Sequence, residues 1–298
     1  MAETRAQAYK QKLDALVRDA QSMPISVRSA VLKQLEDANR EILAAIASSG
    51  PSSYSTTRLQ ALRGEVTRIM QQFQQAATAD VAKAETAAYA SSVKSVDAVV
   101  HAAYGNIVVP PIVDTKTIAV AQGYTADMIS GLSSETASKI NAAIQRGAMG
   151  KSNLGDLVNT IGRALDGGKF SGIFSQTGDR ALSIATHEVM MIDSLASHAR
   201  ISELADHHPG LMKEWVHIPV AMVPRPSHLI ANSQTRKPDE PFHVGGEDLM
   251  YPRDPSGSPE NTIFCHCLQR PKVAPEMLKA TDRERALLKS AGIRILVS

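Results

Sequence analysis

The sequence is poor in aromatic residues and in cysteine, and neither sign of charge dominates. Aromatic residues make up 4% of the 298 positions, and the two cysteines are Cys265 and Cys267. A bridge across Cys-x-Cys would be strained, so we expect two free thiols and no disulfide framework. The formal net charge of +2 is too small for the basic footprint of a dedicated DNA-binding protein.

Long apolar runs and several enzyme motifs are also missing. No run approaches the roughly 18–20 apolar residues of a membrane span, and the polar start "MAETRAQAYK" has no apolar segment of a signal peptide behind it. The Gly-rich phosphate loops of Walker or Rossmann spacing are absent. His187-Glu188 begins a zincin-like motif, but Met191 stands where that motif needs its second histidine. We therefore expect no membrane span and no protease of the zincin type.

Glycine is scarce in the first hundred residues, where only Gly50 and Gly64 occur, while alanine and glutamine are abundant. Such a composition favours long helices, and apolar residues recur at helical spacing. We expect Pro24 to interrupt this pattern and "SSGPSSYSTT" to end it before a further helix of roughly 45 residues. That helix would be about 65 Å long, so it must lie along another helix of the chain or along a partner. The prediction is an extended helical region over residues 1–105 that extends away from the C-terminal domain.

The rest of the chain changes from helical to strand-like patterns. "GNIVVPPIVDT" predicts an extended connector, and we take 106–132 as a linker before one domain over 133–298. Helices are expected within 133–165 and 179–204. The stretch "EWVHIPVAMV" indicates a strand, followed by short strands at "PFHVGG", "LMYP" and "NTIFCHCL", a helix from about Pro275 to Ala291, and a last strand at "IRILVS". The expected fold class is α+β, mainly helical, with a small C-terminal β-containing domain.

The order of motifs over residues 130–272 resembles the phage Mu F-like minor head protein family, also called head morphogenesis proteins. A helix "RALSIATHEVMMIDSLASHAR" is followed by a Trp that opens a strand, by Arg-Pro-Ser-His, by Gly-Gly, by "YPRDPSGSPEN" and by Cys-x-Cys. The chain departs from the family at Thr186-His187, where Arg-Thr is usual, and it lacks the acidic residue that usually precedes the Arg. The matching positions are Ala185, Glu188, Trp215, Arg225, His228, Gly246, Pro252, Asp254, Cys265 and Cys267.

The resemblance implies a role in the virion, at the portal vertex or the capsid interior, after synthesis in the cytoplasm of the host. The implied partners are the portal protein, the major capsid protein or both, with further copies of the chain as another option. Packaged DNA would lie nearby without sequence-specific binding, and the protein would assist head assembly and DNA ejection. We therefore expect no enzyme, no catalytic residues and no obligatory cofactor. The alternative is a zinc-dependent or nuclease-like enzyme centred on His228, Cys265 and Cys267.

Two groups of residues are candidates for the site. We expect Glu188 and Arg225 to form a buried pair that ties the helix to the β region, because a buried arginine needs a charged partner. Trp215, His228 and Asp254 would complete this structural clamp. The second group is a set of zinc ligands by type, namely Cys265, Cys267, His228 and His243. Buried thiols packed beneath a Pro-rich loop, with no metal, are the alternative for this group.

Overall fold

The computed structural model describes residues 4–48, 56–105, 109–151, 154–219 and 224–279. The chain divides into two compact units, each made of segments that are distant in sequence. Unit 1 consists of Met1–Met23, Glu85–Ile118 and Val189–Ser298, and unit 2 consists of Pro24–Ala84 and Ala119–Glu188. Each unit therefore combines parts of the predicted N-terminal region with parts of the predicted C-terminal domain.

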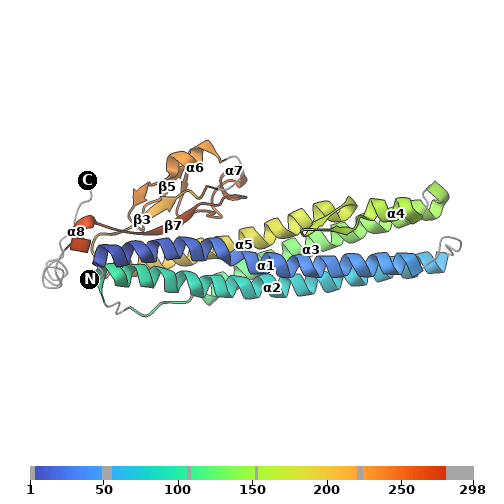
Figure 1. The fold of residues 1–298 in the computed structure, drawn as a ribbon, viewed down its shortest axis with the longest axis horizontal. Coiled ribbons are helices and arrows are strands. Elements are labelled where there is room, and N and C mark those ends of the chain that lie inside the picture. Colours follow the sequence, from blue (N-terminus) through green and yellow to red (C-terminus); the bar gives the residue numbers. More distant parts are fainter. Residues whose placement is uncertain (1–3, 49–55, 106–108, 152–153, 220–223, 280–298) are drawn as a thin grey trace. The chain divides into compact units, whose positions relative to one another are not determined.

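Four long helices contribute to both units, and they make the chain mainly helical, as predicted (Figure 1). They are α1 (Arg5–Ser48), α2 (Thr56–Tyr104), α3 (Thr115–Arg146) and α5 (Gly172–Ala205). Shorter helical elements are the π-helical turn η1 (Gly147–Lys151), α4 (Leu154–Ile161), α6 (Pro226–Ala231), α7 (Pro259–Thr262) and α8 (Pro275–Lys279). Within the described residues, none of the helices has the length and apolarity needed to cross a membrane.

The expected interruption at Pro24 is wrong, because α1 continues through this residue. A proline inside a helix removes one backbone hydrogen bond and costs about 3 kcal/mol. The buried positions Ala20, Val27 and Val31 keep their helical spacing on both sides of it. Burial of this continuous apolar stripe offsets the local cost, so packing decides the path of the helix.

The predicted linker is shorter than expected, since α3 begins at Thr115 and includes residues 115–132 of the range 106–132. Asp114 accepts hydrogen bonds from the backbone N–H groups of Lys116 (3.1 Å) and Thr117 (3.0 Å), which is the arrangement of a helix N-cap. The Thr117 hydroxyl also donates a hydrogen bond to the Asp114 carboxylate. This bond, together with the two backbone bonds, holds the pKa of Asp114 below its usual range.

Unit 2 is a helical unit with one short hairpin. Its strands are β1 (Ala164–Leu165) and β2 (Lys169–Phe170), which pair antiparallel. Asn39 of α1 holds this hairpin, because its side chain donates to the Gly162 carbonyl and accepts from the Ala164 N–H, both at 3.1 Å. Asn39 is buried, and these two bonds satisfy its amide inside the unit.

The remaining strands belong to unit 1 and are coloured orange to red in Figure 1. In the larger sheet, β3 lies between β4 and β7 and is antiparallel to both. A separate hairpin pairs β5 with β6. The bounds are β3 (Leu211–Val216), β4 (Thr235–Arg236), β5 (Phe242–Val244), β6 (Glu247–Leu249) and β7 (Leu268–Val273).

One predicted strand is partly helical, and one short helix was not predicted. The first two residues of "NTIFCHCL" end the helix α7, so that β7 begins only at Leu268. Pro226–Ala231 form the helix α6, which the sequence pattern did not predict. In both cases a proline stands at the first turn of the helix, where its missing N–H costs nothing. The predicted strand "IRILVS", most of the last predicted helix and the end of "EWVHIPVAMV" lie outside the described residues.

The first turns of α1 pack against the sheet of unit 1, which corrects the expectation that residues 1–105 extend away from the C-terminal domain. The Tyr9 hydroxyl donates to the Pro271 carbonyl (3.1 Å) and accepts from the Val273 N–H (3.2 Å). Tyr9 belongs to an apolar cluster with residues of α2, α5, β3 and β7, including Val100, Ile201, Leu211 and Val273.

Candidate metal centre

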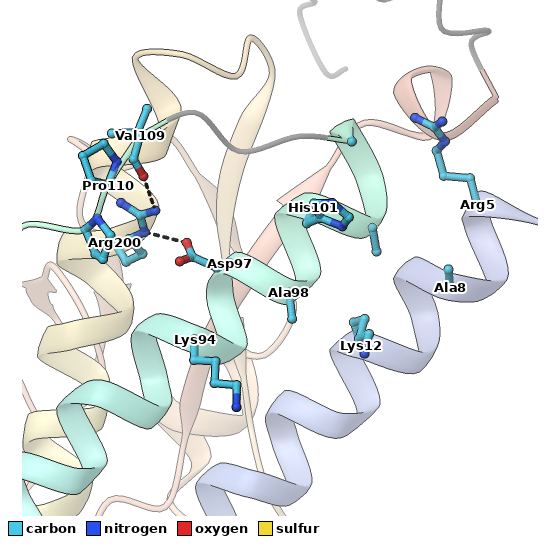
Figure 2. A pocket seen from close by; sticks show the side chains of 13 residues that line it. Arg5, Ala8, Lys12, Lys94, Asp97, Ala98, His101, Val109, Pro110 and Arg200 are labelled. Atoms are coloured by element: carbon cyan, nitrogen blue, oxygen red, sulfur yellow. Dashed lines mark hydrogen bonds and ion pairs between the residues drawn. The ribbon is translucent and has the colours of Figure 1, made fainter.

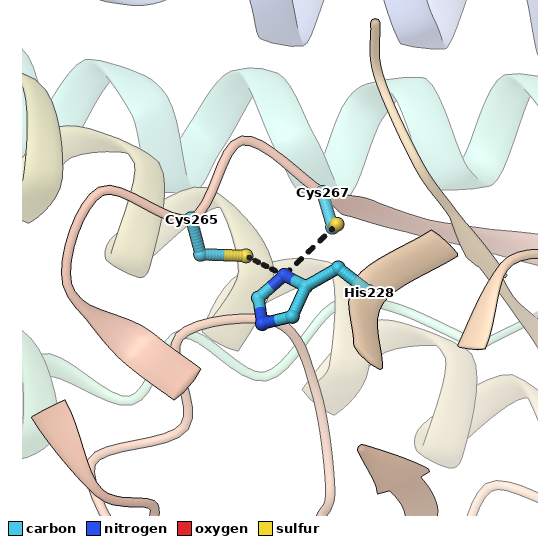
Figure 3. A group of neighbouring side chains, drawn as sticks. All are labelled: His228, Cys265 and Cys267. Atoms are coloured by element: carbon cyan, nitrogen blue, oxygen red, sulfur yellow. Dashed lines mark hydrogen bonds between the residues drawn. The ribbon is translucent and has the colours of Figure 1, made fainter. Parts of the chain in front are cut away.

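His228, Cys265 and Cys267 converge in unit 1 although up to 39 residues separate them (Figure 3). The Nδ1 atom of His228 lies 3.5 Å from the Sγ atom of each cysteine. All three side chains are buried, and their ligand atoms lie within 4.8 Å of one another. The cysteines are free thiols, so the prediction that they pack near His228 without a mutual bridge is confirmed.

A second histidine lies beside one member of this group, Cys267. His217 follows β3 directly, and its Nδ1 atom lies 3.7 Å from the Sγ atom of Cys267. Its backbone N–H donates to the Asn232 side chain at 2.9 Å, which fixes the chain just after the strand. The sequence held a signal for this residue, because His217 follows Trp215 by two positions and alternate residues of a strand share a face.

His243 is not part of the cluster, so its assignment as a metal ligand is corrected. It lies on β5 opposite Asp248 of β6. The two side chains are exposed and form an ion pair with each other when the histidine is protonated. The middle residue of β5 points outward while Phe242 and Val244 are buried, and this alternation turns the imidazole away from the core.

The backbone around the cysteines adopts conformations that ordinary residues rarely take. Phe264 has φ of 56° and Arg253 has φ of 66°, in the left-handed region that costs L-residues roughly 1 kcal/mol or more. Phe264 immediately precedes Cys265, and its own side chain is exposed. Non-glycine residues persist in this region only where their surroundings demand it, so the loop is held in a specific shape.

Arg253 is the buried arginine that holds this loop. Its Nη1 atom donates to the carbonyl oxygens of Cys265 (2.7 Å) and Cys267 (2.9 Å), and its Nη2 atom donates to the Ser194 hydroxyl of α5 (2.7 Å). Arg253 is 1% exposed. One guanidinium therefore joins the Cys-x-Cys loop to a long helix, and the sequence analysis had assigned it no role.

The predicted clamp partners have other contacts. Arg225 is half-buried, and its guanidinium donates to the Ile263 carbonyl. Glu188 is buried, and its carboxylate accepts a hydrogen bond from Thr125 of α3 at 3.5 Å. The expectation that Arg225 is a buried arginine is therefore corrected, while its pairing with Glu188 stays a prediction. The physical reason is that Arg225 precedes the surface helix α6 and does not end a buried strand.

Trp215 and Asp254, the other expected clamp residues, are buried structural residues. The Trp215 ring meets the rings of Phe242 and His228 edge to face, with centroids 5.3 and 6.0 Å apart. Asp254 organises its own loop by accepting from the Met250 N–H (2.8 Å) and from the N–H and hydroxyl of Ser256 (2.9 and 2.7 Å).

The thiols of the cluster differ in acidity. The Cys267 thiol donates to Cys265, and this bond, with support from His228 and Arg253, holds the pKa of Cys265 well below its usual range. The same bond and burial raise the pKa of Cys267. One thiolate beside a thiol and an imidazole is a donor set that suits a soft or borderline cation.

A basic groove forms a second feature of unit 1, with a volume of about 1360 Å³ (Figure 2). Among the described residues that line it, Asp97 is acidic and pairs with Arg200 at 2.6 Å. Arg200 also donates to the Val109 carbonyl at 2.7 Å, as Figure 2 shows. The other basic lining residues come from α1 and α2 and are Arg5, Lys12, Lys94 and His101.

Comparisons with known proteins give one limited likeness. No protein-family model matches the chain, and no solved structure matches it. The chain is 30% identical over 111 residues to a Bacillus subtilis (strain 168) protein described as "Uncharacterized protein YqbB". This match covers 36% of the chain and 35% of the relative, so the chain spans about a third of the length of the curated relative that it matches.

Proposed function

We propose that this chain is a minor head protein of a tailed phage or prophage, which acts by assembly at the portal vertex or the capsid interior. The observation that carries the proposal is the convergence of the head-protein motif. Trp215, His228, Cys265 and Cys267 are spread over some 50 positions of the sequence, and they meet in one buried cluster. Residues that match a motif by chance have no reason to pack together. Residues that match because they belong to a shared domain are expected to do so.

The helices and the basic groove support a docking role. α1 has 44 residues and α2 has 49, and such helices offer long surfaces for helix-pair contacts. The groove presents the ammonium groups of Lys12 and Lys94 from two neighbouring helices. Its chemistry suits an acidic segment of a partner, and we assign that partner to the portal or the major capsid protein.

The burial of the His/Cys cluster supports assembly over catalysis. His228, Cys265 and Cys267 are 3%, 4% and 1% exposed. A nuclease or hydrolase must bring a scissile bond to its metal or nucleophile, and side chains so deeply packed offer a substrate no access. The buried cluster therefore suits a structural part of the protein better than a catalytic centre.

The test is co-expression of the full chain with the capsid and portal proteins that its own phage or prophage encodes. We expect the chain to sediment with purified proheads and to remain bound through a second gradient. Proheads assembled without the chain should be fewer or misshapen in electron micrographs. A chain that stays in the unbound fraction while normal proheads form would refute the proposal.

A further inference from the structure

We propose that His217 completes, with His228, Cys265 and Cys267, a closed tetrahedral zinc site of structural purpose. The sequence suggested His243 as the fourth ligand, but the His243 side chain pairs with Asp248 at the surface. His217 brings its Nδ1 atom to the same cysteine that His228 contacts. The site would thus hold two thiolates and two imidazoles.

The distances agree with tetrahedral zinc. Zn–S bonds of about 2.3 Å and Zn–N bonds of about 2.0–2.1 Å at tetrahedral angles place sulfur and nitrogen ligand atoms about 3.6 Å apart. The observed separations are 3.5 Å for His228 with each cysteine and 3.7 Å for His217 with Cys267. These three pairs have the spacing that one central ion requires. His228, Cys265 and Cys267 already form a group whose ligand atoms lie within 4.8 Å of one another, and binding of the ion would draw the His217 ring from Cys267 into that group.

Hydrogen bonding alone accounts less well for this arrangement. The Nδ1 atom of His228 lies at the same distance from two sulfur atoms, whereas a ring nitrogen forms one well-directed hydrogen bond with one thiol. Equal distances to two sulfurs are expected when the nitrogen and both sulfurs surround a common centre. Figure 3 shows both cysteine side chains directed at this ring atom.

The donor chemistry selects the ion. Thiolate and imidazole ligands suit zinc, whereas calcium and magnesium take oxygen ligands. Two thiolates neutralise the double charge of the ion, and Arg253 donates to the carbonyl oxygens of both cysteines. These bonds fix the peptides on one side of the loop, so that both sulfur atoms are presented on the other side.

The four ligands join three separate parts of unit 1. His217 follows β3, His228 lies in α6, and the cysteines precede β7. The small apolar cluster around them contains Trp215, Ala231, Phe242, Val244 and Leu249, which is little core for such short elements. A closed four-ligand site would supply the missing stability, as structural zinc does in small domains.

The experiment uses the full chain, purified with zinc in the growth medium, and compares His217→Ala with the matched control His243→Ala. Elemental analysis should find about one zinc per chain in the wild type and in the control. Zinc affinity, measured by competition with a chromogenic chelator, should fall by at least about 100-fold in His217→Ala and stay unchanged in His243→Ala. Cobalt reconstitution of the wild type should give the intense ligand-field bands of a tetrahedral site and a thiolate charge-transfer band.

Two results would overturn the proposal. One is a wild-type protein that takes up neither zinc nor cobalt. Its two thiols would then react immediately with a thiol reagent after mild unfolding, because no metal protects them. The other is an equal affinity for zinc in wild type and His217→Ala. Cobalt spectra of the wild type do not depend on any variant, so a folding failure of His217→Ala leaves the test intact. The zinc site does not rest on the head-assembly proposal, and either can fail alone.

Discussion

At the scale of single residues, Arg253 is a buried arginine that joins α5 to the Cys-x-Cys loop through Ser194 and the carbonyl groups of both cysteines. The predicted clamp named Arg225 in place of Arg253, whereas the prediction that His228 lies near the two cysteines is confirmed. The sequence does not single out Arg253, because neither burial nor φ can be read from a lone Arg in a Pro-rich loop. The spacing of His217 from Trp215 was a weak signal for this residue, because its contact with Cys267 joins positions 50 residues apart in the sequence.

Replacing Arg253 should cost far more stability than replacing Arg225. Arg253→Met keeps much of the side-chain volume but leaves two buried carbonyl groups and the Ser194 hydroxyl without their donor. It also removes a charge that opposes the effect of burial, which raises the pKa of Asp193. We expect a loss of about 3–5 kcal/mol in the free energy of unfolding, measured by urea denaturation.

The matched control is Arg225→Met, which removes one hydrogen bond from a half-buried side chain. It should cost about 1 kcal/mol. Equal losses in the two variants would restore the original assignment of the clamp to Arg225.

His198 should make the protein sensitive to mild acid. Burial, with the nearby charge of Lys213, lowers the pKa of His198 to about 4, from a usual value of 6.5. Between these values the folded protein binds fewer protons than the unfolded chain, so stability falls as the pH falls from about 6.5 to about 4. His198→Phe preserves a ring against Tyr251 and removes the titration.

The two proteins should therefore diverge as the pH is lowered. Between pH 7 and pH 5, wild type should lose about 2 kcal/mol more than His198→Phe. Thermal or urea unfolding at each pH gives this difference, and effects of the other titrating groups cancel between the two proteins. Parallel pH profiles would show that His198 titrates normally in the folded state.

At the scale of elements, the long helices were predictable and the short ones were not. α1 and α2 repeat the same apolar spacing many times, so the pattern indicates them strongly. α6 and α7 have 6 and 4 residues, too few for any period to be visible. The path of α1 through Pro24 depends on packing that is distant in sequence, and a local proline rule cannot foresee it.

The docking of α1 on β7 can be tested through one hydroxyl group. Tyr9→Phe removes a buried hydroxyl that donates to the Pro271 carbonyl and accepts from the Val273 N–H. The free energy of unfolding should therefore fall by about 1–3 kcal/mol. Tyr124→Phe is the control, because Tyr124 is 60% exposed, and it should be neutral within about 0.5 kcal/mol. Equal stability of wild type and Tyr9→Phe, in chemical denaturation, would show that this contact contributes nothing.

At the scale of the whole molecule, the sequence predicted the fold class but not how distant segments combine. Each unit takes pieces of the N-terminal helices together with pieces of the later chain. A change in composition along the chain suggested a boundary near residue 105. Such a change can only divide the chain into consecutive segments. Compact units follow contacts between helices, and a single sequence does not reveal those contacts.

The basic groove gives a prediction for partner binding. The double variant Lys12→Glu with Lys94→Glu reverses two charges of the groove and should reduce binding to proheads by about tenfold or more, because like charges then face the acidic segment. Lys33→Glu with Lys83→Glu is the matched control, since both lysines are exposed on the same two helices. Co-sedimentation at several salt concentrations measures both, and equal binding of the two variants would exclude the groove as the docking surface.

The most direct measurement for the account as a whole is quantitative mass spectrometry of proheads that contain the full chain beside the capsid and portal proteins of the same phage or prophage. We expect a fixed ratio of this chain to the portal protein, preserved through successive purification steps. A ratio that falls toward zero with each step, while the portal and capsid proteins stay constant, would contradict it.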